Sequence, residues 1–105
     1  MQKFSDVLPK LGDADNIQRI ELSFGNGTSA GVIENKPGST GSIKMFNYLY
    51  KTFGSISVEA ATEGLSLYCE HTADAEANPG KHPNIDRLVA IIQNKAPLTV
   101  KVIAP

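Results

Sequence analysis

The sequence contains one cysteine, Cys69, and no long hydrophobic run. A single thiol cannot form an internal disulfide bond, which argues against the cysteine-rich frameworks of small secreted domains. No segment approaches the roughly 18 apolar residues that a membrane-spanning helix needs, and the N-terminal stretch MQKFSDVLPKLGDAD lacks the apolar centre of a signal peptide. We therefore expect a cytoplasmic protein that has no membrane partner.

The chain also lacks an excess of charge of either sign. Its 10 lysine and arginine residues are balanced by 11 aspartate and glutamate residues, which gives a formal net charge of −1. Because no overall positive field attracts a polyanion, we expect no nucleic-acid partner. The length suits one domain, residues 1–105, since folding such a chain buries roughly two-thirds of its unfolded surface.

A β-hairpin is the clearest prediction of local structure and covers residues 17–33. Ile20, Leu22 and Phe24 alternate with polar residues along the first strand, and the returning strand alternates in the same way. The dipeptide Asn26-Gly27 between the strands supplies the positive φ angles that a tight hairpin turn requires.

Two amphipathic helices and a closing strand follow. Apolar residues recur at three- and four-residue spacing over 43–53, before Gly54, and over 85–92, behind Pro83. The segment LTVKVI near the C-terminus alternates as a strand. These elements predict an α+β fold, in which helices pack on one face of a small, mainly antiparallel sheet made of the hairpin and the last strand.

Residues 56–77 allow two interpretations. ISVEAA and LSLYCEH each alternate like strands, and residues 62–64 could form the turn of a second hairpin. At about 100° per residue, however, the apolar side chains fall on one side and the acidic ones on the other. This separation favours one long helix, although Gly64 inside it costs about 1 kcal/mol relative to alanine.

The segment PGKHPN, residues 79–84, is the strongest candidate for a binding site. The free N–H groups at the start of the following helix form a positive pole, beside which a lysine adds charge and a histidine an adjustable donor. The residues predicted to bind a small anion are Lys81, His82, Asn84 and Ile85. The alternative is a plain turn between helices, because Asp86 already complements the helix pole.

A second helix start lies at KPGSTGSIK, residues 36–44. Small residues lead into the helix, and Lys36 and Lys44 flank them. The spacing does not match the Gly-Lys-Ser or Gly-Lys-Thr ending of a phosphate-binding P-loop. A flexible capping loop is the alternative to a second anion-binding pole.

Both histidines and the cysteine lie in residues 69–88. His71 and Asp74 could share a helix face, with His82 as a third ligand, but the paired spacing of zinc sites is missing. We therefore predict no metal and no cofactor, and expect His71 to be a partly buried core residue with one nitrogen hydrogen-bonded. Cys69 is expected to be a buried or boundary thiol, because adjacent helix residues point about 100° apart and cannot activate it.

The run GLSLYCEHTADAEANPGKHPNIDRL, residues 64–88, resembles a small bacterial family known as a domain of unknown function. The IELSF strand and the IENKPG turn extend this resemblance toward the N-terminus. It implies a bacterial, cytoplasmic protein of a single domain. The family brings with it no activity, cofactor or catalytic residue.

Two functional hypotheses follow. In the first, the protein is a non-catalytic module that binds a small anion or a protein partner through the turn at 79–84. In the second, it is a small hydrolase or metal-dependent enzyme that uses His71 and His82 with Glu70 and Asp74. Imidazoles side by side over a concavity would favour the enzyme, and imidazoles far apart would favour the module. A homodimer is also expected as an option, with a second copy covering the free face or an edge of the sheet.

Overall fold

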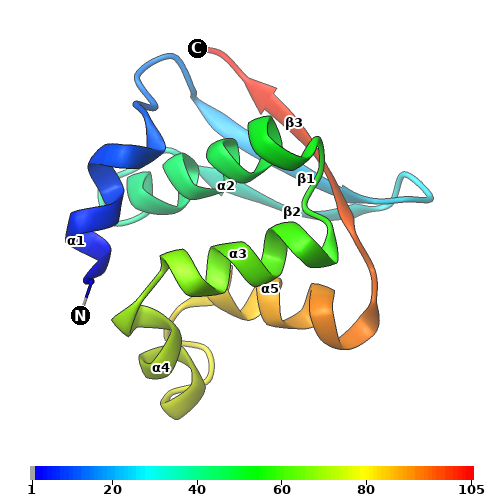
Figure 1. Cartoon of the computed structure of the whole chain (residues 1–105). Helices are drawn as coiled ribbons and strands as arrows, with labels where there is room; N and C mark the ends of the chain where they lie inside the picture. The colour runs from blue at the N-terminus through cyan, green and yellow to red at the C-terminus, as the bar shows by residue number, and fades with distance from the viewer. Residues whose placement is uncertain (1) are drawn as a thin grey trace.

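The computed structural model describes residues 2–105 and has helices on one side of a three-stranded sheet (Figure 1). In chain order the elements are α1 (Phe4–Val7), the 3-10 helix η1 (Leu8–Leu11), β1 (Arg19–Phe24), β2 (Ser29–Glu34), α2 (Thr40–Phe53), α3 (Val58–Leu67), α4 (Glu70–Ala77), α5 (Pro83–Asn94) and β3 (Leu98–Ile103). This arrangement confirms the α+β fold that the sequence predicts.

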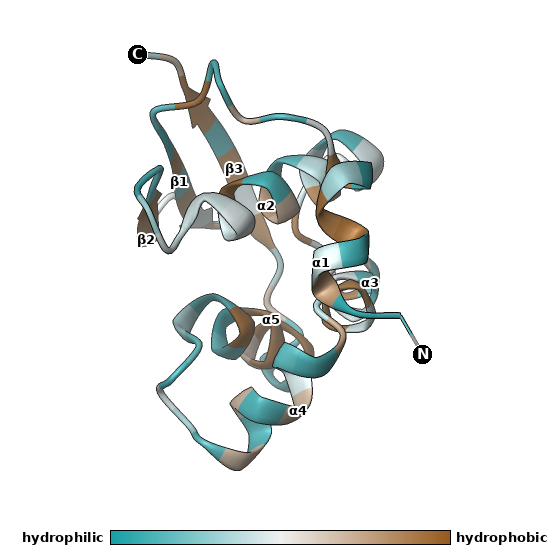
Figure 2. Cartoon of the chain, turned by 90° about the vertical axis from the view of Figure 1, so that its left-hand side faces the viewer, coloured by the Kyte–Doolittle hydropathy of each residue, from teal (hydrophilic) through white to brown (hydrophobic). Residues whose placement is uncertain are grey.

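The sheet has the strand order β2-β1-β3, and both pairings are antiparallel. The predicted hairpin is therefore present, and the predicted closing strand pairs with its first strand. Ile20 lies opposite Ile33 on one side and Val102 on the other, and its side chain is fully buried. Figure 2 shows the alternation of hydrophilic and hydrophobic bands along β3, as expected for a strand with one buried face.

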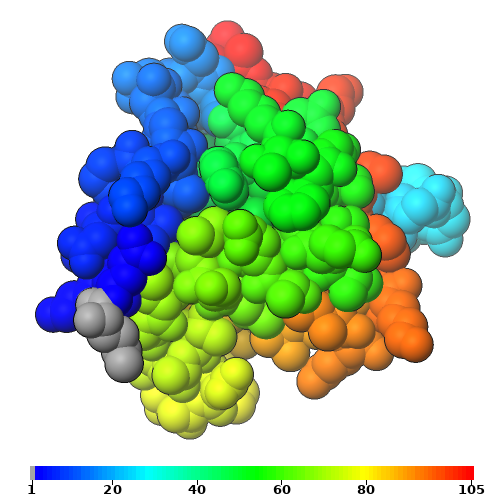
Figure 3. All heavy atoms as spheres, in the orientation of Figure 1, coloured from blue at the N-terminus to red at the C-terminus, as the bar shows by residue number. Residues whose placement is uncertain are grey.

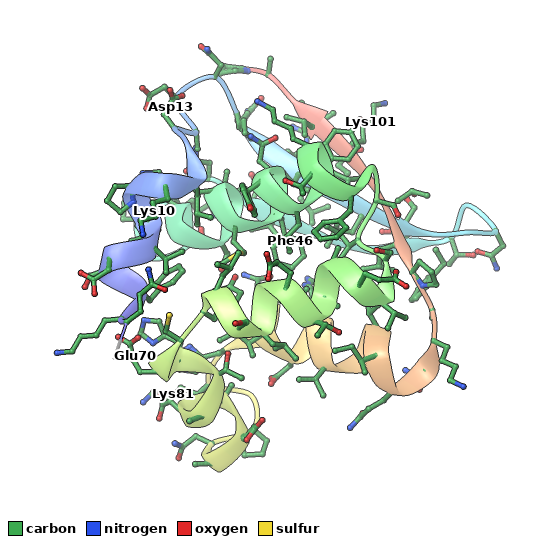
Figure 4. All side chains as sticks on the ribbon, in the orientation of Figure 1. Lys10, Asp13, Phe46, Glu70, Lys81 and Lys101 are labelled. Carbon is green, nitrogen blue, oxygen red and sulfur yellow. The ribbon has the colours of Figure 1, made fainter. Side chains whose placement is uncertain are left out.

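Helix α2 supplies the centre of the core. Ile43, Phe46 and Leu49 have no exposed surface, and Phe46 lies between α2 and α3 in Figure 4. Gly64 of α3 makes the close approach of the helices possible: a Cβ atom at this position would lie 2.8 Å from Leu88 of α5 and 3.0 Å from Leu49 of α2. The glycine that weakens α3 as an isolated helix thus lets three helices meet.

The prediction of one long helix over residues 56–77 is wrong, and so is the alternative hairpin. The segment forms two helices, and the chain turns between them at Cys69, whose φ of 56° and ψ of −122° interrupt the helix. The Thr72 hydroxyl donates to the Leu65 carbonyl at 2.6 Å, and so satisfies a carbonyl that the interruption releases from the helix ladder. The helical period is clear in α3 and weak in α4, but the pattern does not indicate a change of direction between them.

The N-terminal segment is attached to α4 by a long-range hydrogen bond. The Phe4 N–H donates to Glu70 Oε1 at 2.8 Å, and this bond lowers the pKa of Glu70. Figure 3 shows the N-terminal residues, in blue, against the yellow-green surface around α4. Phe4 is thereby placed beside residues that are more than sixty positions away in the sequence.

Candidate functional site

A cavity of about 250 Å³ lies at the N-terminal ends of α2 and α5. Its wall has three parts: Gly38, Gly41 and Ser42 at the start of α2, residues 81–85 at the start of α5, and Phe4, Tyr68 and His71. We call it the helix-start cavity. Lys81, His82, Asn84 and Ile85, the residues for which the sequence predicts anion binding, all belong to this wall.

The start of α5 offers fewer free donors than the sequence suggests. The N–H groups of Ile85 and Asp86 both donate to the His82 carbonyl, at 3.1 and 3.0 Å. Asn84 contributes the free groups: its backbone N–H and its side-chain NH₂ have no acceptor among residues 2–105, while its Oδ1 accepts from Arg87. Asn84 is therefore the residue of this turn that can donate to a ligand through both backbone and side chain.

Asp74 on α4 holds the two basic side chains of the turn. Its Oδ2 atom lies 2.9 Å from Lys81 Nζ and 2.7 Å from His82 Nε2, and Lys81 is labelled beside α4 in Figure 4. The hydrogen bond from His82, followed by that from Lys81, lowers the pKa of Asp74 to about 2. The carboxylate is thus ionised at neutral pH and holds both basic side chains beside the N-terminal end of α5.

Four aromatic rings form a continuous series along the cavity. Tyr68 stacks on Phe4 with centroids 5.1 Å apart, Phe4 meets the His71 ring edge-on at 5.2 Å, and His71 lies 5.4 Å from His82. His71 is partly buried, as expected, but its ring makes no hydrogen bond within the described residues. The expected hydrogen-bonded core histidine is therefore part of a cavity wall.

The two imidazoles consequently lie side by side over a concavity, which is the arrangement expected of the enzyme hypothesis. Adjacency in sequence does not produce it. Because the chain turns at Cys69 and returns through the 78–82 turn, His71 at the start of α4 and His82 before α5 come together. The signal available in the sequence was the grouping of both histidines around one glycine-containing turn.

Ser42 and Tyr68 form a hydroxyl pair in the same wall. Their oxygens are 2.8 Å apart, and burial raises the pKa of the Tyr68 phenol, so the phenol stays protonated at neutral pH. Two hydroxyl groups have two hydrogens, of which the bond between them uses one. The other has no acceptor among residues 2–105, and the pair can donate it to a ligand.

The loop before α2 is held by hydrogen bonds to the end of β2, and part of it faces the cavity; none of its side chains caps the N–H groups of α2. Ser39 Oγ donates to the Glu34 carbonyl at 2.6 Å, and Thr40 Oγ1 donates to Asn35 Oδ1 at 2.9 Å. Gly38 and Gly41 form part of the wall, and a Cβ atom at Gly41 would lie 3.3 Å from the Phe4 ring. The expected cap of α2 is therefore missing among the side chains of this loop, and the second anion-binding pole stays a prediction.

Cys69 does not show the features of a catalytic thiol. Desolvation, with the carboxylates of Glu70 and Asp6, raises its pKa, and Sγ donates to the Leu67 carbonyl at 3.4 Å. A thiol with a raised pKa is a poor nucleophile at neutral pH. Within residues 2–105, no group of three or more histidine, cysteine, aspartate or glutamate side chains is arranged to hold a metal ion.

The fold and the cavity together define a small α+β protein with a polar, aromatic-walled cavity between two helix starts. The chain belongs to a family described as uncharacterized protein conserved in bacteria (DUF2322), whose sequence model matches residues 4–102. This confirms the resemblance seen in residues 64–88. No curated protein and no solved structure matches the chain. None of the helices in residues 2–105 is long and apolar enough to cross a membrane.

Proposed function

We propose that this protein binds a small anion, a phosphate or carboxylate group of a metabolite, in the helix-start cavity. The observation that carries the proposal is the surplus of hydrogen-bond donors in the wall. Asn84 offers a backbone and a side-chain donor, the Ser42–Tyr68 pair offers one hydrogen, and the His71 ring is unpaired among residues 2–105. Donors without acceptors suit a ligand rich in oxygen acceptors.

The charges around the turn support the same ligand. Asp74 and Lys81 neutralise each other, so protonation of His82 makes this group of three side chains positive. The first turns of α2 and α5 add the partial positive charge of their helix ends. Asp86 opposes an anion less than its position suggests, because its Oδ2 atom accepts from the Gly80 N–H at 3.1 Å.

Titration with inorganic phosphate, followed by amide chemical shifts, tests this proposal. We expect saturable shifts at residues 38–42 and 80–86, and a loss of affinity of about tenfold or more in Lys81→Ala, because a hydrogen bond to a charged group contributes about 1.5–3 kcal/mol. Lys101→Ala is the matched control, because Lys101 lies on β3, far from Lys81 in Figure 4. The absence of any saturable shift at millimolar phosphate would contradict the proposal.

An enzymatic function is the second candidate. The observation that supports it is the distance of 5.4 Å between the ring centroids of His71 and His82. His82, oriented by Asp74, and the unpaired His71 could act as an acid and base pair on a phosphate ester, one taking a proton from water and the other protonating the leaving oxygen. Against this, neither imidazole in residues 2–105 accepts a hydrogen bond from a serine, threonine or cysteine, since Ser42 and Cys69 bond elsewhere.

Hydrolysis of p-nitrophenyl phosphate between pH 5.5 and 8 separates the two candidates. Turnover that disappears in both His71→Gln and His82→Gln would support the enzyme, because glutamine keeps hydrogen bonding but cannot transfer the proton. Saturable phosphate binding without turnover would support the binding module.

The remaining expectations concern partners and compartment. We propose a cytoplasmic location, because a lone cysteine suits a reducing compartment, and neither a nucleic-acid nor a membrane partner, because the net charge of −1 provides no basic field. A protein partner at the 79–84 turn and a homodimer remain proposals. The outer face of the sheet, where a second copy would pack, carries the Arg19–Glu21 ion pair at 2.9 Å.

A further inference from the structure

The donors of the helix-start cavity lie at two separate places in its wall. One place is the α5 start, with Asn84 and the basic side chains held by Asp74. The other is the Ser42–Tyr68 hydroxyl pair, which comes from α2 and from the end of α3. In the series of rings, Phe4 and His71 come between Tyr68 and His82, so a lone inorganic anion bound at the α5 start leaves the hydroxyl pair without an acceptor. A ligand that satisfies both needs a second oxygen some distance from its anionic group.

Aromatic rings lie along the same wall. Phe4 contacts both Tyr68 and His71, with ring centroids 5.1 and 5.2 Å away. Gly38 and Gly41 add no side chain beyond a hydrogen atom, so they leave room on their side of the cavity. Between its two sets of donors, the cavity thus presents an apolar surface on which a ring can lie.

We infer that the ligand is a phosphorylated monosaccharide, a deduction that rests on the proposed anion-binding function. The phosphate accepts from Asn84 and pairs with His82 at the α5 start. The apolar face of the sugar ring lies against Phe4 and His71, and a sugar oxygen accepts the spare hydrogen of the Ser42–Tyr68 pair. The volume of about 250 Å³ suits such a molecule, being just below the range of roughly 300–1,000 Å³ that drug-sized ligands occupy.

An aromatic phosphate without hydroxyl groups fits less well. Its ring would lie against Phe4, but the ligand would cover the half-buried Ser42 hydroxyl and the buried Tyr68 hydroxyl with a surface that has no oxygen atoms. A site built to hydrogen-bond a ligand oxygen discriminates strongly against an analogue that lacks it. The hydroxyl pair is therefore the feature that selects a sugar.

Calorimetric titration with ribose 5-phosphate, glucose 6-phosphate, phenyl phosphate and inorganic phosphate tests the inference. We expect at least one sugar phosphate to bind about tenfold or more tightly than inorganic phosphate and phenyl phosphate, as expected when a ligand oxygen satisfies otherwise unpaired donors. The double variant Ser42→Ala/Tyr68→Phe should remove most of this gain and leave inorganic phosphate affinity within about twofold, because it deletes both hydroxyl groups but not the α5 start. Both hydroxyls must go, since either one alone keeps a hydrogen that is free to donate. Thr52→Ala, at an exposed position of the same helix, should change neither affinity.

The outcomes separate this inference from the function on which it rests. If inorganic phosphate and all three organic phosphates fail to bind, both are wrong. If inorganic phosphate binds at residues 80–86 but the sugar phosphates bind no more tightly than phenyl phosphate, anion binding stands and the sugar is wrong. A gain for the sugar phosphates that persists undiminished in Ser42→Ala/Tyr68→Phe would also overturn the assignment, because the hydroxyl pair would not be selecting the ligand.

Discussion

Replacing Gly64 with alanine tests the packing of the three central helices. The added Cβ would lie 2.8 Å from Leu88 Cδ1 and 3.0 Å from Leu49 Cδ1, and both leucines are fully buried. Carbon atoms at optimal contact are about 3.5–4.0 Å apart, so one or both leucines must move by several tenths of an ångström. The substitution thus fills space that neighbouring side chains already occupy.

Two opposing contributions set the expected magnitude. Overpacking a well-packed core costs about 1–3 kcal/mol, whereas alanine in place of a helix-interior glycine returns about 1 kcal/mol. We expect Gly64→Ala to lower the free energy of unfolding by about 1 kcal/mol, as measured by urea denaturation. Ser66→Ala, at an exposed position of the same helix, should be neutral or slightly stabilising, since it changes propensity without a clash.

A double-mutant cycle identifies the cause. Leu88→Val shortens the side chain that the new methyl group meets, so its cost should be smaller in the Gly64→Ala background than in the wild type. A Gly64→Ala variant more stable than the wild type would refute the reasoning, because helix propensity would then outweigh the clash. Additive effects of the two substitutions would show that the clash with Leu88 is not the cause of the lost stability.

Three other predictions concern backbone strain, pH and assembly. Because Cys69 has a φ of 56°, Cys69→Gly should be more stable than Cys69→Ala by about 1 kcal/mol in urea denaturation, and the reverse order would show that the turn is not strained. The pKa of Asp74 is depressed to about 2 from an ordinary 3.8, so the ionised carboxylate stabilises the native state at any pH above 3.8. This contribution is lost as the pH falls from about 4 to 2. Asp74→Asn should therefore flatten the pH dependence of stability in that window, and an unchanged acid profile would contradict the pairing of Asp74 with Lys81 and His82. We expect the protein to form a homodimer, and size-exclusion chromatography with light scattering measures its molar mass in solution. A monomer at high concentration would contradict this prediction.

The sequence predicts those elements that follow one period from end to end. Ile20 and its neighbours alternate over the whole of β1, and the three- and four-residue spacing of Ile43, Phe46 and Leu49 continues through α2. The helical period of residues 58–67 weakens over residues 70–77, and such a pattern is compatible with one helix or with two. The break at Cys69 depends on long-range packing and on the Thr72 hydroxyl, which no local pattern reports.

The residues of the candidate site likewise include some that the sequence could predict and some that it could not. Lys81, His82 and Asn84 could be found from the sequence because they belong to one turn before one helix. Phe4 and Ser42 could not, since each is about 40 residues or more from that turn and reaches the cavity through the tertiary fold. The second helix start was visible as a glycine-rich loop, but only the tertiary fold, in which α3 packs against both α2 and α5, places both starts in one wall.

The strained turn at Cys69 links the fold to the site. A residue held in such a backbone conformation costs about 1–3 kcal/mol, so the surrounding contacts must stabilise it. Thr72 and Glu70 supply those contacts, the first by its bond to the Leu65 carbonyl and the second by its bond to the Phe4 N–H. If the helix continued without interruption through Cys69, residues 70–77 would extend along the axis of α3 and would carry His71 away from His82. The turn therefore places His71 and Phe4 together in the cavity wall. There Phe4 offers a ligand an aromatic surface, and His71 offers it an unpaired imidazole.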